Sequence, residues 1–266
     1  MHLFAVKLPH AARSEFLFLL ELLFTLLVLL SFIAVATYVT RQLRAGRFLN
    51  GENTPKPFTV SGPFGFFFAA SVLVLVFLQS LFYPMVVLFG LAGVLLQDGR
   101  TAWEQFGLGR LRPMQVLNWS LLGCGAVILV GNPLYQAAGW LMDLVHVPHP
   151  EQESVETFRQ YNQSSAILGF MFQAVFLFPV IEELFFRGFL LTFLKKYTST
   201  WLALVLSAGV FAFAHVNLDA VLPLWFLGVV LGMAYEQTGS LLLPMGIHAC
   251  FNLVTALNLL LDKGGN

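Results

Sequence analysis

Residues 178–191 read Phe-Pro-Val-Ile-Glu-Glu-Leu-Phe-Phe-Arg-Gly-Phe-Leu-Leu, so the adjacent carboxylates Glu182 and Glu183 lie in an apolar stretch whose only other charge is Arg187. A charged side chain at the centre of a bilayer costs at least about 2.5 kcal/mol, even on lenient insertion scales. Ionisable residues are therefore rare in membrane helices and commonly mark functional sites. The stretch predicts a membrane helix and a candidate site within it.

The composition of the whole chain is typical of a membrane protein. Of the 266 residues 58% are apolar and 11% are charged, against about 25% charged residues in ordinary soluble domains. A membrane helix needs about 20 apolar residues, or fewer where it is buried among other helices. Stretches of suitable composition are 16–40 (which contains Glu21), 58–97, 114–142, 164–181, 197–214, 220–235 and 237–261. The expected fold class is therefore an all-α, polytopic transmembrane helix bundle.

The charged residues cluster between these stretches and predict an orientation. Basic residues flank 58–97 on both sides and Lys195-Lys196 follows the two glutamates, whereas 146–163 is acidic. By the positive-inside rule the basic loops are cytoplasmic and the acidic loop lies outside. The stretch 58–97 is then a hairpin of two short spans that turns near Gln79-Ser80 or Pro84, or one of its loops breaks the rule. The hairpin gives about eight spans in all.

The polar loop 146–163 also predicts a boundary between two regions. Residues 1–160 form an N-terminal transmembrane region without recognised motifs, and 161–266 form a second region of four helices. Short loops make successive helices antiparallel neighbours, so we expect this second region to form a compact bundle. The formal net charge of zero gives no electrostatic reason to expect nucleic acid as a partner.

Helical spacing assigns the two carboxylates to different roles. Glu183 and Arg187 are four residues apart with the acid first, which is the favourable order for an ion pair on one helix face. Glu182 points about 100° away from Glu183 and lacks that partner. A carboxylate without a partner is a candidate general base. The alternative is that Glu182 is a second buried partner of Arg187.

Two histidines lie in the neighbouring apolar helices. His215 ends the run Phe211-Ala-Phe-Ala-His215, in which Phe211 can hold the imidazole in one orientation, and His248 shares a helix face with Asn252. At about 1.5 Å per residue, Glu182 and the two histidines lie within about 10 Å of one depth, so they can converge. A structural reading stays open, because polar side chains often bridge membrane helices through hydrogen bonds.

A glutamate, two imidazoles and an amide supply the parts for hydrolysis. The carboxylate can take a proton from water, while the imidazoles bind a metal or stabilise an oxyanion. No serine or cysteine in an apolar span has a clear helical relation to a histidine, since Cys250 points almost opposite to His248. A water nucleophile is therefore favoured over a covalent one.

The three motifs, taken in order, resemble those of the CPBP family, the CAAX protease and bacteriocin-processing group, which includes the type II CAAX prenyl endopeptidases. The family pattern is Glu-Glu-x-x-x-Arg, then Phe-x-x-x-His, then His-x-x-x-Asn or Asp. In this chain these motifs lie at 182–187, 211–215 and 248–252. The resemblance covers roughly 164–261 and leaves the first 160 residues unmatched.

The resemblance implies an intramembrane endopeptidase with a water-accessible catalytic cavity in its C-terminal four-helix half. The family is commonly called a metalloprotease group, and His215, His248 and a glutamate could hold zinc with an open position. Such a zinc site would compete with a free Glu182 acting as the base. No organic cofactor is implied. The implied catalytic residues are Glu182, His215, His248 and Asn252, with Glu183, Arg187 and Phe211 in support.

Two other functions stay open. A non-proteolytic relative could act as a membrane binding or immunity partner, because a fold does not guarantee turnover. A proton-coupled transporter would use the glutamates and histidines as a relay and should carry inverted repeats or paired broken helices. The expected partners of a protease are a peptide or membrane-protein substrate and the lipid bilayer. Its expected place is the plasma membrane of a prokaryote, with the active site toward the cytoplasmic half.

Overall fold

A computed structural model describes residues 37–46, 54–78, 80, 82–146, 153–161 and 163–265, together with the single positions 26, 30 and 33. Every regular element in these parts of the chain is helical, which confirms the all-α fold class. Among the described residues, four helices are long and apolar enough to cross a membrane: Pro113–Leu144, Ser164–Leu194, Val221–Thr238 and Leu242–Leu261. Three more apolar helices are shorter: Gly62–Phe77, Tyr83–Asp98 and Thr200–Ala214. The chain is thus a helical integral membrane protein, and most of the expected span 16–40 lies outside the described residues.

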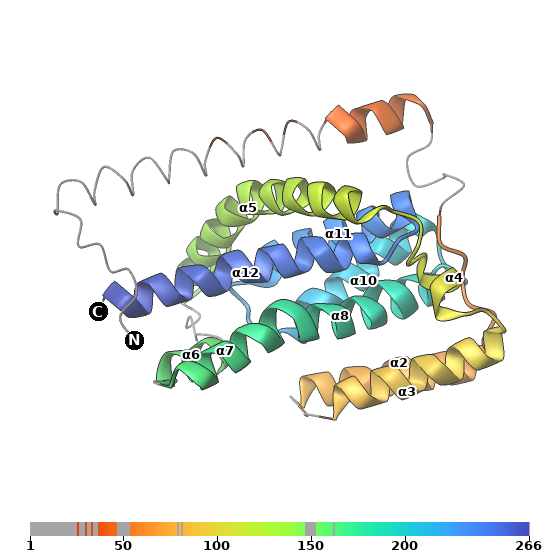
Figure 1. Cartoon of the computed structure of the whole chain (residues 1–266), viewed down its shortest axis with the longest axis horizontal. Helices are drawn as coiled ribbons and strands as arrows, with labels where there is room; N and C mark the ends of the chain where they lie inside the picture. Colours follow the sequence, from red (N-terminus) through yellow and green to blue (C-terminus); the bar gives the residue numbers. More distant parts are fainter. Residues whose placement is uncertain are drawn as a thin grey trace.

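The stretch 58–97 forms the predicted hairpin of two helices, α2 (Gly62–Phe77) and α3 (Tyr83–Asp98), which lie side by side (Figure 1). Pro84 falls in the first turn of α3, where a proline removes no helical hydrogen bond. The two helices approach closely at Gly90, because a Cβ there would lie 2.0 Å from the Phe68 ring. The count of about eight membrane crossings stays a prediction.

The basic loops that flank this hairpin meet at one end of the bundle. Arg100 Nη2, which follows α3, donates to the carbonyl of Pro57, which precedes α2, at 2.9 Å. Lys195 directly follows the long helix that carries the two glutamates, and its Nζ donates to the carbonyl of Pro55 at 2.8 Å. Three basic loops from distant parts of the sequence therefore lie together, as a hairpin at 58–97 requires.

Two helices connect the hairpin to the C-terminal region. The short α4 (Ala102–Phe106) begins with a capping box, in which Thr101 and Glu104 satisfy each other's backbone N–H groups. The long α5 (Pro113–Leu144) contains Pro133 and curves strongly in Figure 1, as expected where a proline interrupts the hydrogen bonds of a helix. Helix α5 packs against α11 and α12 of the C-terminal region. A boundary near residue 160 stays a prediction.

The C-terminal region contains one long interrupted helix and three further helices. From Ser164 to Leu194 the chain stays helical, but the turn widens twice to π-helix, with hydrogen bonds from residue i to i+5. The short α6 (Glu153–Gln160) precedes this region, whose elements in order are α7 (Ser164–Phe172), η1 (Gln173–Leu177), α8 (Phe178–Glu183), η2 (Leu184–Leu191), α9 (Thr192–Leu194), α10 (Thr200–Ala214), α11 (Val221–Thr238) and α12 (Leu242–Gly265). Helices α10 and α12 both pack against α11.

Phenylalanines build much of the core between the hairpin and the C-terminal helices. The Phe68 ring of α2 meets the Phe189 ring of η2 edge-on, with the ring centroids 4.6 Å apart. Phe189 in turn stacks on Phe193 at 5.3 Å. A single hydrophobic cluster includes residues of α2, α3, η2, α10 and α11, so the hairpin supports the helix that carries the two glutamates.

Candidate active site

Glu182 and Glu183 occupy the last two positions of α8, the short α-helical segment between η1 and η2. π-helical turns are rare and occur frequently at functional sites. Each π turn widens the helix and changes the direction in which the following side chains point. The two carboxylates therefore lie where the helix geometry is least regular, and the surrounding helices determine their partners.

Glu183 is a fully buried acceptor that connects two other helices. Its Oε1 accepts from Arg187 Nη1 at 2.7 Å and lies 3.0 Å from His248 Nδ1 of α12. Arg187 Nη2 donates to the carbonyl of Gly228 in α11 at 3.1 Å, and its guanidinium lies 4.4 Å from the centroid of the Phe211 ring. The expected Glu183–Arg187 ion pair is present. Its contact with His248 is an additional feature that the sequence did not predict.

Glu182 faces both histidines. Its Oε2 lies 3.9 Å from His215 Nε2 and 3.8 Å from His248 Nε2. The side chains of Glu182 and His215 are 18% and 19% exposed, so this face of the site is partly open, whereas His248 is 2% exposed. Three of the predicted catalytic residues are thus brought together from α8, the C-terminal end of α10, and α12.

Hydrogen bonds fix which ring nitrogen of each histidine carries its proton. His215 Nδ1 lies 2.9 Å from the carbonyl of Phe211, and His248 Nδ1 lies beside the Glu183 carboxylate. Both partners only accept, so both Nδ1 atoms donate, and the Nε2 atom of a neutral ring then carries a lone pair. With both rings neutral, the Glu182 carboxylate and the two Nε2 atoms would face one another as three acceptors without a proton between them. A proton on one Nε2, or a donor between the three atoms, is needed there.

The start of the loop after α10 holds His215 in place. His215 is the residue that ends the helix, and Val216 follows it with φ of 50°. The left-handed region is unfavourable for a β-branched residue, and such strain is found mainly where the surrounding structure enforces it. Phe211 packs its ring against the His215 imidazole, with centroids 4.8 Å apart, as the four-residue spacing predicted.

Asn252 lies one turn beyond His248 on α12 but has a different partner. Its Nδ2 donates to the carbonyl of Ala174 in η1 at 2.8 Å. No hydrogen bond joins Asn252 to Glu182 or to either histidine in the part of the chain that the structure describes. In this arrangement Asn252 ties α12 to the π-helical turn before the glutamates. Its catalytic role stays a prediction.

The zinc hypothesis can be tested against the distances. Two ligands of a tetrahedral zinc ion with bonds of about 2.1 Å lie about 3.4 Å apart. The separations of Glu182 from His215 and His248, 3.9 and 3.8 Å, are longer. Among the described residues, no group of three or more His, Cys, Asp or Glu side chains is arranged to hold a metal ion. The residues as placed are farther apart than the ligands of a zinc ion, and metal binding stays a prediction.

Tyr83 is a neighbour of the site that the sequence did not predict. It begins α3, and its ring stacks on Phe178, one helical turn before Glu182, with centroids 6.3 Å apart. Its phenol group interacts electrostatically with Glu182. No hydrogen bond joins Tyr83 Oη to another described residue. Tyr83 comes from the region without motifs, and only its position at the start of a hairpin helix could have drawn attention to it.

Comparison with known proteins gives one match. Residues 164–254, which extend from α7 into α12 and contain all three motifs, match the family model of the Rce1-like type II CAAX prenyl endopeptidases. No curated protein and no solved structure matches the chain. The resemblance read from the three motifs is therefore confirmed, and the segment 164–254 is similar to the CAAX protease family of Rce1-like type II prenyl endopeptidases.

Proposed function

We propose that the protein is an intramembrane endopeptidase of the CAAX type that hydrolyses a peptide bond with a water activated by Glu182. The observation that carries this proposal is the convergence of Glu182 Oε2 on the Nε2 atoms of His215 and His248, at 3.9 and 3.8 Å, inside an apolar helix bundle. The similarity of 164–254 to CAAX prenyl endopeptidases supports the same class of reaction.

The separations between these atoms suit a bridging water. A water about 2.8 Å from Glu182 Oε2 and from one Nε2 spans 3.8 Å when the two hydrogen bonds meet at roughly 90°. One water can contact all three groups in this way. As its oxygen attacks the scissile carbonyl carbon, Glu182 takes the proton, and the carbonyl oxygen becomes an oxyanion. Glu182 then gives the proton to the leaving amine as the C–N bond breaks.

The surroundings of the two imidazoles suggest different roles. His248 Nδ1 lies 3.0 Å from the Glu183 carboxylate, and this contact holds the ring with Nε2 directed toward Glu182. In the resting enzyme His248 Nε2 can contact the water that bridges to Glu182, and during the reaction its N–H can donate to the oxyanion. His215 Nδ1 faces only a neutral carbonyl, so we assign His215 a neutral ring whose Nε2 orients the water.

We propose that the substrate is a peptide or a membrane-protein segment and that the site opens toward the cytoplasmic half of a prokaryotic plasma membrane. The basic loops with Lys195 and Arg100, which meet at one end of the bundle, support this orientation through the positive-inside rule. Whether the substrate carries a prenyl group can be tested by offering the same peptide with and without one.

The test uses the purified protein in detergent with a quenched fluorescent peptide library that includes prenylated and unmodified peptides. We expect wild type to cleave and Glu182→Gln to lose activity by about 10²–10⁴-fold, the usual contribution of a general base. Glu156→Gln, in the exposed part of α6, is the matched control and should cleave as wild type does. Cleavage that persists in Glu182→Gln would overturn the assignment of the base. A wild type that binds but cleaves no peptide would favour the binding or immunity partner.

A further inference from the structure

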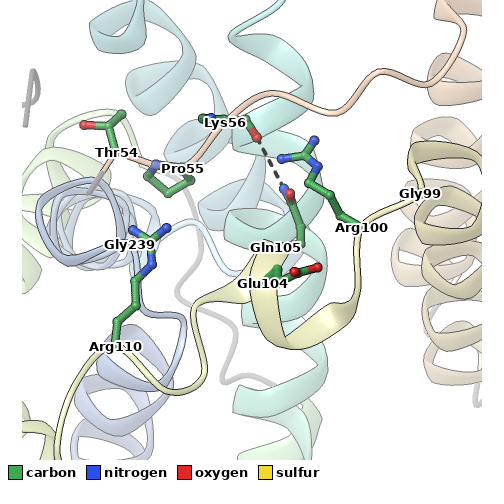
Figure 2. A pocket seen from close by; sticks show the side chains of 9 residues that line it. All are labelled: Thr54, Pro55, Lys56, Gly99, Arg100, Glu104, Gln105, Arg110 and Gly239. Atoms are coloured by element: carbon green, nitrogen blue, oxygen red, sulfur yellow. Dashed lines mark hydrogen bonds between the residues drawn. The ribbon is translucent and has the colours of Figure 1, made fainter. Parts of the chain in front are cut away.

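A polar cavity of about 420 Å³ lies at the end of the bundle where the basic loops meet (Figure 2). Its walls come from four segments that are distant in the sequence: 54–56 before α2, 99–100 after α3, 104–110 around α4, and Gly239 between α11 and α12. It is separate from the catalytic residues, none of which lines it. Its volume falls within the range of about 300–1,000 Å³ typical of small-molecule sites.

Gln105 lines this cavity and carries a buried acceptor that has no partner. The residue is 5% exposed and is held at two points, because its Nε2 donates to the carbonyl of Lys56 at 3.3 Å and its own carbonyl accepts from Tyr235 Oη at 3.1 Å. Figure 2 shows its side chain directed from α4 toward Lys56. Gln105 Oε1 is buried and has no hydrogen-bond partner in the described structure. Buried polar atoms are almost always paired, so this oxygen points to a donor that a ligand supplies.

The charges on the cavity wall are mainly positive. Lys56, Arg100 and Arg110 line it, against the single lining acid Glu104, although Arg100 is also ion-paired with Asp98 behind the wall. Lys56 Nζ makes no hydrogen bond or ion pair with a residue that the structure describes. Glu104 is committed elsewhere, because its Oε2 accepts from the N–H and the hydroxyl of Thr101 at 3.1 and 2.9 Å. These hydrogen bonds lower the pKa of Glu104, so it is ionised at neutral pH and the lining as a whole still favours an anion.

We propose that this cavity binds the headgroup of an anionic phospholipid, with its phosphate near Lys56 and Arg100 and a headgroup hydroxyl donating to Gln105 Oε1. The cavity lies beyond the last turns of α3 and α11, where membrane helices reach the level of lipid phosphates. Basic pockets between membrane helices on the cytoplasmic side bind phosphate-bearing headgroups in this way. A soluble glycerol phosphate has the same chemistry, and the test below distinguishes the two sources.

The experiment uses delipidated protein in detergent and measures bound ligand by native mass spectrometry and Tm by thermal unfolding. The probes are phosphatidylglycerol, phosphatidylcholine and glycerol 1-phosphate. We expect phosphatidylglycerol to bind and to raise Tm. Phosphatidylcholine, which is neutral overall and whose choline has no hydrogen-bond donor, should do neither. Equal binding of the two lipids would overturn the proposal, and binding of glycerol 1-phosphate without phosphatidylglycerol would overturn the lipid as the source.

Three variants test whether the cavity itself is responsible. Lys56→Gln should weaken phosphatidylglycerol binding about threefold, the effect of one exposed ion pair. Glu104→Gln should strengthen it by a similar factor, because glutamine keeps the capping box but removes the negative charge from the wall. Arg112→Gln removes a basic residue that does not line the cavity and should leave binding unchanged. Because the first two effects are opposite in sign, general damage to the fold cannot produce both. Equal affinities in wild type, Lys56→Gln and Glu104→Gln would overturn the site.

Discussion

Glu182 and Glu183 are neighbours in sequence but belong to two different regions of the molecule. The region around Glu183 is closed, because the carboxylate is fully buried and contacts both Arg187 and His248. The region around Glu182 is partly open, and the two imidazoles near the carboxylate lie at 3.9 and 3.8 Å, too far for a hydrogen bond. The difference suggests that the closed region fixes the geometry of the site while the open region carries the chemistry. Substitutions on the two sides should therefore fail in different ways.

The largest expected effect is on the open side. Glu182→Gln should reduce kcat by about 10²–10⁴-fold while leaving Tm nearly unchanged, because a neutral amide of the same shape replaces a carboxylate that holds no ion pair with Arg187. Peptide cleavage and thermal unfolding on the same preparation measure both quantities. A large loss of Tm in this variant would contradict the comparison, since it would make Glu182 structural as well.

On the closed side, we expect a substitution of Glu183 to lower the stability of the protein. Glu183→Gln leaves the Arg187 guanidinium buried without its counter-charge, and breaking a buried pair costs about 3–5 kcal/mol. The double variant Glu183→Gln with Arg187→Met removes both charges and should recover much of that loss, as measured by thermal unfolding.

The same double variant separates structure from catalysis. Its kcat should stay low although its stability returns, because His248 Nδ1 has lost the charged carboxylate acceptor that orients its ring toward Glu182. If restoring stability also restores kcat, then Glu183 acts only by holding the helices together.

The contrast between the two sides also explains how far the sequence could predict the site. The Glu183–Arg187 pair was predictable because it depends on the spacing within one helix. The approach of Glu182, His215 and His248 was predictable from depth alone, since short loops make the helices antiparallel neighbours. The hairpin at 58–97 was predictable because basic loops flank it on both sides.

Other features depend on how the helices rotate against one another, which spacing does not reveal. The contact of His248 with Glu183 needs one particular rotation of α12 relative to α8. The bond from Asn252 to the carbonyl of Ala174 depends on the π-helical turn η1, where the regular helical pattern is interrupted. Tyr83 reaches the site from a region without motifs. The cavity at the end of the bundle is formed by four segments that are distant in the sequence, and no single segment has a signature for it.

Tyr83, which belongs to the N-terminal region, lies near the open region around Glu182. Tyr83→Phe keeps the ring that stacks on Phe178 but removes the hydroxyl. We propose that the Tyr83 hydroxyl, which has no hydrogen-bond partner among the described residues, hydrogen-bonds to the bound water or substrate, so that its loss should lower kcat about tenfold, the value of about 1.4 kcal/mol, with little change in Tm. Separate kcat and KM values are the measurement. An unchanged kcat would mean that Tyr83 only packs against the helix and takes no part in catalysis.

The smallest expected effect concerns the turn that aims His215 at Glu182. Val216 has φ of 50° and its side chain is exposed, so Val216→Asn removes little packing and substitutes a residue that tolerates the left-handed region. We expect it to raise stability by about 1 kcal/mol and to leave kcat near the wild-type value. Val216→Gly also relieves the strain but frees the backbone in the unfolded chain and in the turn, so it should gain less stability and lower kcat several-fold.

Thermal unfolding and peptide cleavage compare the two variants. If both variants lose stability, the backbone at Val216 stores no strain. If Val216→Gly cleaves as fast as Val216→Asn, the direction of His215 does not depend on this turn, and its bond to the Phe211 carbonyl is sufficient to hold the ring.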